Sequence, residues 1–306
     1  MIGRESRPAL LLLAVLLVLA SAIGAVPMTP ASWGVQLGMA APLLCAAAAV
    51  MPAMLGGGGG IDVSIGPIIG FVNAILVGVL AVQLGLASAW VLVPAALLLG
   101  AALGAVNGLL ATVLRVQPII ATLGTYLVLS GLTVTIVPAP LGGAPAWLRG
   151  LASGWAVLPM AALIAAWAAL LRTPFYAHLM ATGSDARAAF SAGVPVGVVR
   201  FLSYAVGGAF AGLAGLMETA LIGSADATIG PRLTLVAISA AALGGVGLAG
   251  GQGGLLAALL GGADIFLLQT TLTAFDVSTF VLQTAYGLIL VASVCLNAAL
   301  RPRRAA

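Results

Sequence analysis

The chain has 306 residues, of which 62% are hydrophobic and 6% charged, and its mean hydropathy is +1.24. Soluble domains carry roughly 25% charged residues, so this composition excludes a water-soluble fold and predicts an all-α integral membrane protein. The formal net charge of +4 does not indicate a nucleic-acid partner, because the arginines are scattered among hydrophobic runs and form no basic patch with aromatic residues.

Long apolar runs predict about ten transmembrane helices in a single transmembrane domain over residues 1–306, since a membrane-crossing helix needs about 20 apolar residues. The first run follows Arg4 and Arg7 and resembles a signal peptide. We interpret it as an uncleaved first span, because it is longer than a typical signal-peptide core and a second hydrophobic run follows at once. The predicted spans are 9–26, 34–55, 66–84, 91–114, 118–137, 155–171, 201–222, 233–248, 254–272 and 278–299.

The distribution of arginine predicts the orientation of these spans. With the N-terminus inside and ten crossings, Arg149 and Arg232 fall outside, and nine arginines fall on the cytoplasmic side. This asymmetry is what the positive-inside rule requires, so both termini are expected in the cytoplasm. The cytoplasmic arginines are Arg4, Arg7, Arg115, Arg172, Arg187, Arg200, Arg301, Arg303 and Arg304.

Five consecutive glycines, Gly56–Gly60, break the second span. Each glycine costs about 1 kcal/mol relative to alanine inside a helix, so the helix is expected to stop there. Irregular backbone at membrane depth must be buried in protein or line a water-filled cavity. Asp62, which follows the break, is either a charge at the cytoplasmic mouth, part of a translocation path, or a clamp on freed backbone amides. We favour the clamp, because a carboxylate is stabilised near a helix N-terminus.

The segment 172–200 is the longest predicted cytoplasmic loop, and it contains a short helix. Ser184 or Asp185 is suited to cap a helix over Ala186–Ala192, and Gly193 followed by Val194 and Pro195 ends it. A helix of about eight residues is unstable alone in water. It therefore packs either on its own spans or on a partner protein, and the residues themselves do not decide between the two.

Two carboxylates, Glu218 and Asp264, fall inside predicted spans. Intramembrane carboxylates are costly and are candidates for function, although an interfacial position is an equal alternative. Glycines at Gly207, Gly208, Gly212 and Gly215 predict close helix contact within one chain, in preference to a dimer motif.

The residue inventory contains no catalytic set and no cofactor site. Lysine is absent, so the chain has no Walker A loop of its own. Cys45 and Cys295 are expected to be buried structural residues. The single histidine, His178, has no second ligand nearby to form a metal site.

The sequence Gly60-Ile61-Asp62-Val63-Ser64-Ile65-Gly66 resembles the signature of ribose-type sugar permeases in the ATP-binding-cassette (ABC) importer superfamily. Asn107-Gly108, Thr122-Leu123-Gly124-Thr125, the segment from Thr173 to Val194 and the glycine-rich run Gly250-Gly251-Gln252-Gly253 resemble further family elements in the same order. Departures at Tyr176-Ala177, Ser184-Asp185, Leu221 and Thr234–Ser239 leave the solute and the choice of homodimer or heterodimer open.

The resemblance implies a permease of the bacterial inner membrane that pairs with a second permease subunit. It also implies an ABC ATP-binding subunit as partner and a periplasmic or lipid-anchored substrate-binding protein. The cytoplasmic helix would then be the docking element, with ATPase-coupling residues Ser184, Asp185, Arg187, Ala188, Ala189 and Gly193. In the family that the chain resembles, ATP drives import. The resemblance therefore implies that the partner subunit, and not this chain, binds the nucleotide.

Polar side chains within the spans are the candidates for the solute path, because such groups face the protein interior. Each could equally be a hydrogen bond between packed helices. The candidates are Asp62, Ser64, Asn73, Asn107, Thr122 and Thr125. The alternative function is a proton-coupled secondary transporter that uses Glu218 or Asp264 and needs no partner ATPase.

Overall fold

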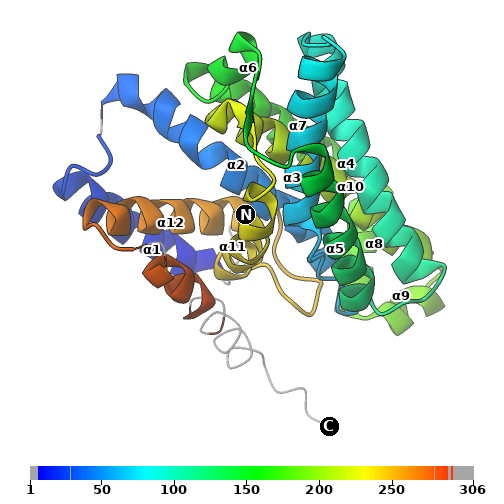
Figure 1. Cartoon of the computed structure of the whole chain (residues 1–306). Coiled ribbons are helices and arrows are strands. Elements are labelled where there is room, and N and C mark those ends of the chain that lie inside the picture. Colours follow the sequence, from blue (N-terminus) through cyan, green and yellow to red (C-terminus); the bar gives the residue numbers. More distant parts are fainter. Residues whose placement is uncertain (1–5, 28, 279, 289–290, 292–306) are drawn as a thin grey trace.

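The structure is a computed structural model that describes residues 6–27, 29–278, 280–288 and 291. Nearly all secondary structure in this part of the chain is helical (Figure 1). The helices of the N-terminal half are α1 (Arg7–Ala22), α2 (Pro30–Leu55), α3 (Ile65–Ala74), η2 (Ile75–Gln83), α4 (Ala89–Thr112) and α5 (Pro118–Ile136). Those that follow are α6 (Ala146–Gly150), η3 (Gly154–Ala156), α7 (Val157–Leu171), α8 (Pro174–Ser184), α9 (Ala186–Ser191), α10 (Val196–Ile222), α11 (Ile229–Leu243) and α12 (Leu255–Ala274).

Seven helical stretches among the described residues are long and apolar enough to cross a membrane. They overlap the predicted spans 34–55, 66–84, 91–114, 118–137, 155–171, 201–222 and 254–272. The apolar helices α1 and α11 are shorter, and they correspond to the predicted spans 9–26 and 233–248. Much of the predicted span 278–299 lies outside the described residues. The all-α multi-pass membrane fold is confirmed, while ten crossings with both termini inside stay a prediction.

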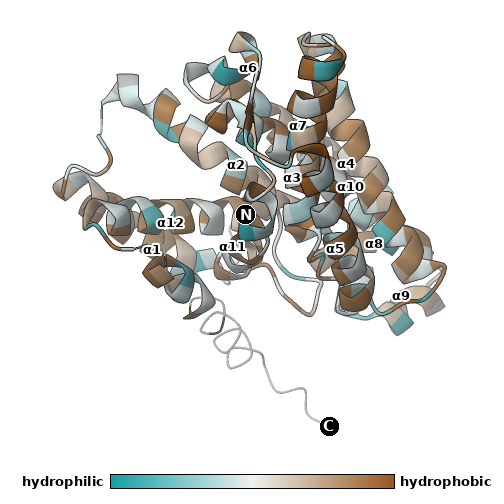
Figure 2. Ribbon diagram, in the orientation of Figure 1, coloured by the Kyte–Doolittle hydropathy of each residue, from teal (hydrophilic) through white to brown (hydrophobic). Residues whose placement is uncertain are grey.

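The centre of the molecule is formed by α2 and α10. The small residues Ala46–Ala49 let neighbouring helices approach α2, and these four alanines are completely buried. α10 packs most extensively against α4, α2 and α3. The outer helices α4 and α5 instead expose large apolar side chains such as Leu98, Leu127 and Val128. The ribbons of both helices are coloured largely as hydrophobic in Figure 2. Such exposure on a soluble protein would be exceptional, and it fits a lipid environment.

Glycine determines how closely α4 and α10 approach. A Cβ atom placed on Gly208 would lie 2.8 Å from the Cα atom of Gly104 and would also collide with the carbonyl oxygen of Gly100. A Cβ atom on Gly212 would collide with the backbone of Ala96. The prediction that these glycines serve packing within one chain is confirmed.

The third predicted span differs from a regular α-helix. α3 covers only Ile65–Ala74, and the span continues as the π-helix η2 to Gln83. π-helical turns are rare and widen the backbone spiral. The hydrophobic pattern of the sequence carries no signal for this change.

The cytoplasmic loop prediction for 172–200 was incomplete. Residues 174–184 form a helix, α8, which begins with Pro174 in its first turn and buries Leu179 completely. α10 also begins at Val196, five residues before the predicted start at 201. The segment is therefore a helical hairpin of α8 and α9 that leads directly into α10.

The opposite end of the molecule is also ordered. Two short strands, β1 (Leu141–Gly142) and β2 (Ser224–Ala225), pair in antiparallel fashion. The indole nitrogen of Trp147 in α6 donates to the carbonyl oxygen of Ala87 at 2.8 Å. The strand pair joins the predicted external loop 138–154 to the segment that follows α10, and the Trp147 bond joins the same loop to the segment before α4.

Candidate transport path and coupling surface

The glycine run provides a backbone turn that other residues do not readily form. α2 ends at Leu55, and Gly57, Gly58 and Gly59 have φ angles of 66°, 65° and 74°. Side-chain-bearing residues rarely adopt this left-handed region. The break predicted from the sequence is therefore present, and it delivers Asp62 and Ser64 to the start of α3.

Asp62 accepts two hydrogen bonds from Ser64, two residues further along the chain. Its Oδ1 atom accepts from the backbone nitrogen of Ser64 at 2.9 Å and from the Ser64 hydroxyl at 2.7 Å. Asp62 is 1% exposed, so it is not a charge at an open mouth in the single chain. This geometry agrees with the clamp that we favoured, because the carboxylate holds an amide at the N-terminus of α3.

Side chains of α4 and α5 complete this network around the break. The amide nitrogen of Asn107 donates to the Ser64 hydroxyl at 2.7 Å and to Asp62 Oδ2 at 3.2 Å. The Thr125 hydroxyl donates to Asn107 Oδ1 at 2.6 Å. Thr122 Oγ1 accepts from the backbone nitrogen of Val63 at 3.2 Å. Five of the six predicted path residues thus form one cluster, the break network, in which only Thr125 is partly exposed: Asp62, Ser64, Asn107, Thr122 and Thr125.

Asn73 belongs to a separate polar cluster. Its amide nitrogen donates to Thr219 Oγ1 and to the carbonyl oxygen of Ser224, both at 2.9 Å, and its Oδ1 accepts from the backbone nitrogen of Asp226 at 3.0 Å. Asn73 therefore ties the end of α3 to α10 and β2. The structure does not bring it to the break network.

The predicted cytoplasmic helix is present as α9, a six-residue helix. Asp185 caps it, since its Oδ1 accepts from the backbone nitrogens of Arg187 at 2.9 Å and Ala188 at 3.0 Å. Gly193, with φ of 86°, follows the end of the helix as predicted. Ala189 is buried against the protein, whereas Phe190 is 72% exposed.

A contact that the sequence analysis did not anticipate joins this hairpin to the break. Gly183, where α8 meets α9, lies against the carbonyl oxygen of Leu55, which also accepts a hydrogen bond from Gly251 at 3.0 Å. A Cβ atom on Gly57 would lie 3.0 Å from Gly183 Cα. We call Leu55, Gly57, Gly183 and Gly251 the glycine junction. The glycine-rich run at 250–253 was the available signal, but its partners are distant in sequence.

Arg200 makes further contacts with the glycine run that follows α2. Its Nε atom donates to the carbonyl oxygen of Gly56 at 3.3 Å, and its guanidinium lies over Gly58. Together with Arg115 it lines a cavity of about 170 Å³ beside the break. The carbonyl oxygen that Arg200 contacts follows the C-terminal end of α2, where a helix end favours cations.

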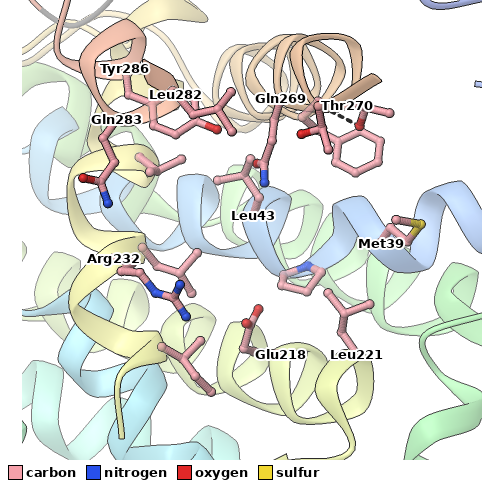
Figure 3. A pocket seen from close by; sticks show the side chains of 16 residues that line it. Met39, Leu43, Glu218, Leu221, Arg232, Gln269, Thr270, Leu282, Gln283 and Tyr286 are labelled. Carbon is pink, nitrogen blue, oxygen red and sulfur yellow. Dashed lines mark hydrogen bonds between the residues drawn. The ribbon is translucent and has the colours of Figure 1, made fainter. Parts of the chain in front are cut away.

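A larger cavity of about 460 Å³ lies between α2, α10, α11, α12 and the helical residues 280–288 (Figure 3). Glu218 and Arg232 point into it from different helices, with Gln269 and Gln283 on the opposite wall. Of these, the sequence analysis singled out only Glu218 as a site candidate. The lining residues are Met39, Pro42, Leu43, Glu218, Leu221, Ile229, Arg232, Leu233, Val236, Phe266, Gln269, Thr270, Thr273, Leu282, Gln283 and Tyr286.

The structure separates the two intramembrane carboxylates. Asp264 lies midway along α12 and is completely buried, and neither carboxylate oxygen has a hydrogen-bond partner. Its place midway along α12 favours a position inside the span over an interfacial one, which stays a prediction. Glu218 lies in the last turns of α10 and reaches the large cavity.

Within the described part of the chain, no group of three or more histidine, cysteine or acidic residues could hold a metal ion. Cys45 is buried, and its Sγ atom lies 3.8 Å from the sulfur of Met160. This agrees with its predicted structural role, while Cys295 lies outside the described residues. His178 stands half-buried in α8.

A bundle of helices long enough to cross a membrane, with a broken span, buried polar clusters and a short exposed helix, fits a multi-pass membrane transport protein. Comparison with known proteins supports this class, because residues 34–296 match a family model described as "Branched-chain amino acid transport system / permease component". The chain belongs to this permease family. Permeases carry solutes and are not enzymes.

Curated relatives confirm the resemblance to ribose-type ABC permeases. The chain is 32% identical to the ribose import permease protein RbsC of Escherichia coli strain K12, over 79% of this chain and 76% of that protein. It is also 32% identical to RbsC of Bacillus subtilis strain 168, over 78% and 76% of the two chains. The Autoinducer 2 import system permease protein LsrC of Salmonella choleraesuis strain SC-B67 is 33% identical over 79% and 71%. No solved structure matches the chain.

Proposed function

We propose that this chain is the permease subunit of a bacterial ABC importer that moves a small polar solute, most simply a monosaccharide, across the inner membrane. ATP is hydrolysed by a partner subunit, since the chain has no lysine for a Walker A loop. The names of its relatives support a sugar-like cargo, because they include ribose and autoinducer 2 import permeases.

The observation that carries the proposal is the link between α9 and the break. α9 presents Phe190 outward and is capped by Asp185, and the glycine junction connects the preceding turn at Gly183 directly to the end of α2. A partner that moves α9 therefore pushes on the point where the second span is interrupted. We assign coupling to Ser184, Asp185, Arg187, Ala188, Ala189 and Gly193.

A displacement of the break is then passed through the break network to the helices α4 and α5 beside the path. Asp62 and Asn107 join the start of α3 to α4 and α5 through bonds between side chains, so the break cannot shift without displacing those helices. We propose that Asp62, Ser64, Asn107, Thr122 and Thr125 set the cytoplasmic section of the path. Asn73, tied to α10 and β2, belongs to its outer section.

The complete transporter contains further subunits. A second permease copy or homologue pairs with this one, and the solute passes between the two. A periplasmic or lipid-anchored binding protein delivers the solute to the end that carries α6 and β1. Both termini and α9 face the cytoplasm, in agreement with the arginine distribution.

The proposal is tested by tagging the chain in its native membrane and identifying the proteins that co-purify. We expect an ATP-binding subunit and a solute-binding protein. Phe190→Asp removes the aromatic anchor and is expected to release the ATPase. The control is Trp155→Asp, which changes an aromatic residue of similar exposure, 65%, in η3 just before the start of α7. Retention of the ATPase by Phe190→Asp would refute docking at α9.

Proton-coupled transport is the second candidate, and one observation favours it. Asp264 has no hydrogen-bond partner for either oxygen within the bundle, and such carboxylates serve as proton relays in some transporters. Under this alternative Asp264→Asn abolishes uptake, and uptake requires no ATPase. Under the ABC proposal the same variant continues to transport.

A further inference from the structure

The cavity beside Glu218 is unusual for its polar lining within membrane-crossing helices. Arg232, Gln269 and Gln283 are exposed in the single chain, and Glu218 is 8% exposed. Side chains of this kind facing lipid would lose hydrogen bonds with water and gain none. Their convergence on one hollow means that the hollow holds water or a polar ligand.

The charges of the lining are balanced. Glu218 and Arg232 face the cavity from α10 and α11, so one acidic and one basic side chain line the same hollow (Figure 3). An anionic solute meets the carboxylate, and a cationic solute meets the guanidinium, so each is opposed by a like charge. A neutral solute is favoured.

The hydrogen-bonding groups point to hydroxyls. A carboxylate only accepts, a guanidinium only donates, and the amides of Gln269 and Gln283 do both. A hydroxyl group also donates and accepts, so a polyhydroxylated molecule can pair with every one of these groups. The apolar lining, including Phe266 and Tyr286, suits the carbon skeleton of such a molecule. The volume, about 460 Å³, lies within the range of small-ligand sites.

The position of the cavity along α10 agrees with a site where solute enters an importer from outside the cell. α10 has 27 residues and is therefore about 40 Å long. Glu218 lies near its far end, roughly 33 Å along the helix axis from the end beside α9. The cavity is thus on the side that receives solute, and the coupling hairpin is on the other.

Resting on the proposed function, we infer that this cavity is the outer binding site for the transported solute, a neutral polyhydroxylated compound, with Glu218, Arg232, Gln269 and Gln283 selecting it. A zwitterionic amino acid could also pair with Glu218 and Arg232. It would leave the amides of Gln269 and Gln283 facing an aliphatic side chain, so the lining favours the polyhydroxylated solute.

The test measures ATP-dependent uptake by the complete complex in proteoliposomes. The solutes are D-ribose with further neutral pentoses and hexoses, ribose 5-phosphate and L-leucine. We expect the wild type to take up a neutral sugar, and Glu218→Gln and Gln269→Leu to raise its KM at least tenfold with a much smaller change in maximal rate. Glu218→Asp, which keeps the carboxylate, should be intermediate.

Gln83→Leu is the matched control, because it removes an exposed glutamine from η2, away from the cavity, and its KM should equal that of the wild type. Unchanged KM in the cavity variants would overturn the inference while leaving the importer proposal standing. Uptake of L-leucine or the phosphate in place of neutral sugars, or loss of permease pairing in Gln269→Leu, would also overturn it. A wild-type complex that takes up none of the solutes refutes the proposed function itself.

Discussion

Gly208 offers the sharpest test of how the helices pack. In Gly208→Ala the new methyl group would lie 2.8 Å from Gly104 Cα and would overlap the carbonyl oxygen of Gly100. Both obstacles are backbone atoms, so α4 must move as a unit. Overpacking of this kind costs about 1–3 kcal/mol.

The control is Gly124→Ala in α5, where a Cβ atom meets nothing within 4 Å. Both substitutions share the gain of roughly 0.5–1 kcal/mol for replacing a helical glycine with alanine. The difference between the two variants therefore isolates the packing cost. The free energy of unfolding of the purified protein, measured by titration with SDS in mixed micelles, should be about 1–3 kcal/mol lower for Gly208→Ala. Equal stability of the two variants would show that α4 and α10 do not touch as described.

Three further predictions concern acidic residues. Asp62→Ala leaves buried donors of the break network without an acceptor and should lower the free energy of unfolding by about 1–3 kcal/mol; unchanged stability in the same titration would contradict the clamp. Asp185→Ala removes the cap of α9, worth about 0.5–2 kcal/mol, and should weaken retention of the ATPase in pull-downs, whereas Asp185→Ser should preserve it; identical behaviour of the two would argue against capping. Asp264→Leu removes a buried carboxylate that lacks partners and should stabilise the protein by about 1–3 kcal/mol with uptake intact; abolished uptake would support proton coupling.

Features encoded locally were predictable from the sequence. The end of α2 followed from five consecutive glycines, and the cap and stop of α9 followed from Asp185 and Gly193. Hydrophobic runs gave the seven long spans with small errors at their ends. In each case the deciding residues lie within one or two helical turns of the feature that they determine.

Features that depend on distant partners were not predictable. The helix α8 carries little local signal and is stabilised by burial of Leu179, so it was read as a loop. Asn107 and Thr125 were chosen as path candidates one by one, but their hydrogen bond across two helices required the packing of α4 on α5. Arg232 and Gln283 looked like ordinary residues near span ends, and only the fold gathers them around one cavity with Glu218.

The role as an ABC permease subunit is tested most directly by the energy source for uptake. The complete complex is reconstituted in proteoliposomes, and uptake of D-ribose and other neutral sugars is measured with ATP, without ATP, and with ATP plus a protonophore. Uptake is expected only with ATP on the side of the ATP-binding subunit, and the protonophore should have no effect. Uptake that persists without ATP and collapses when the proton gradient is removed would contradict the account.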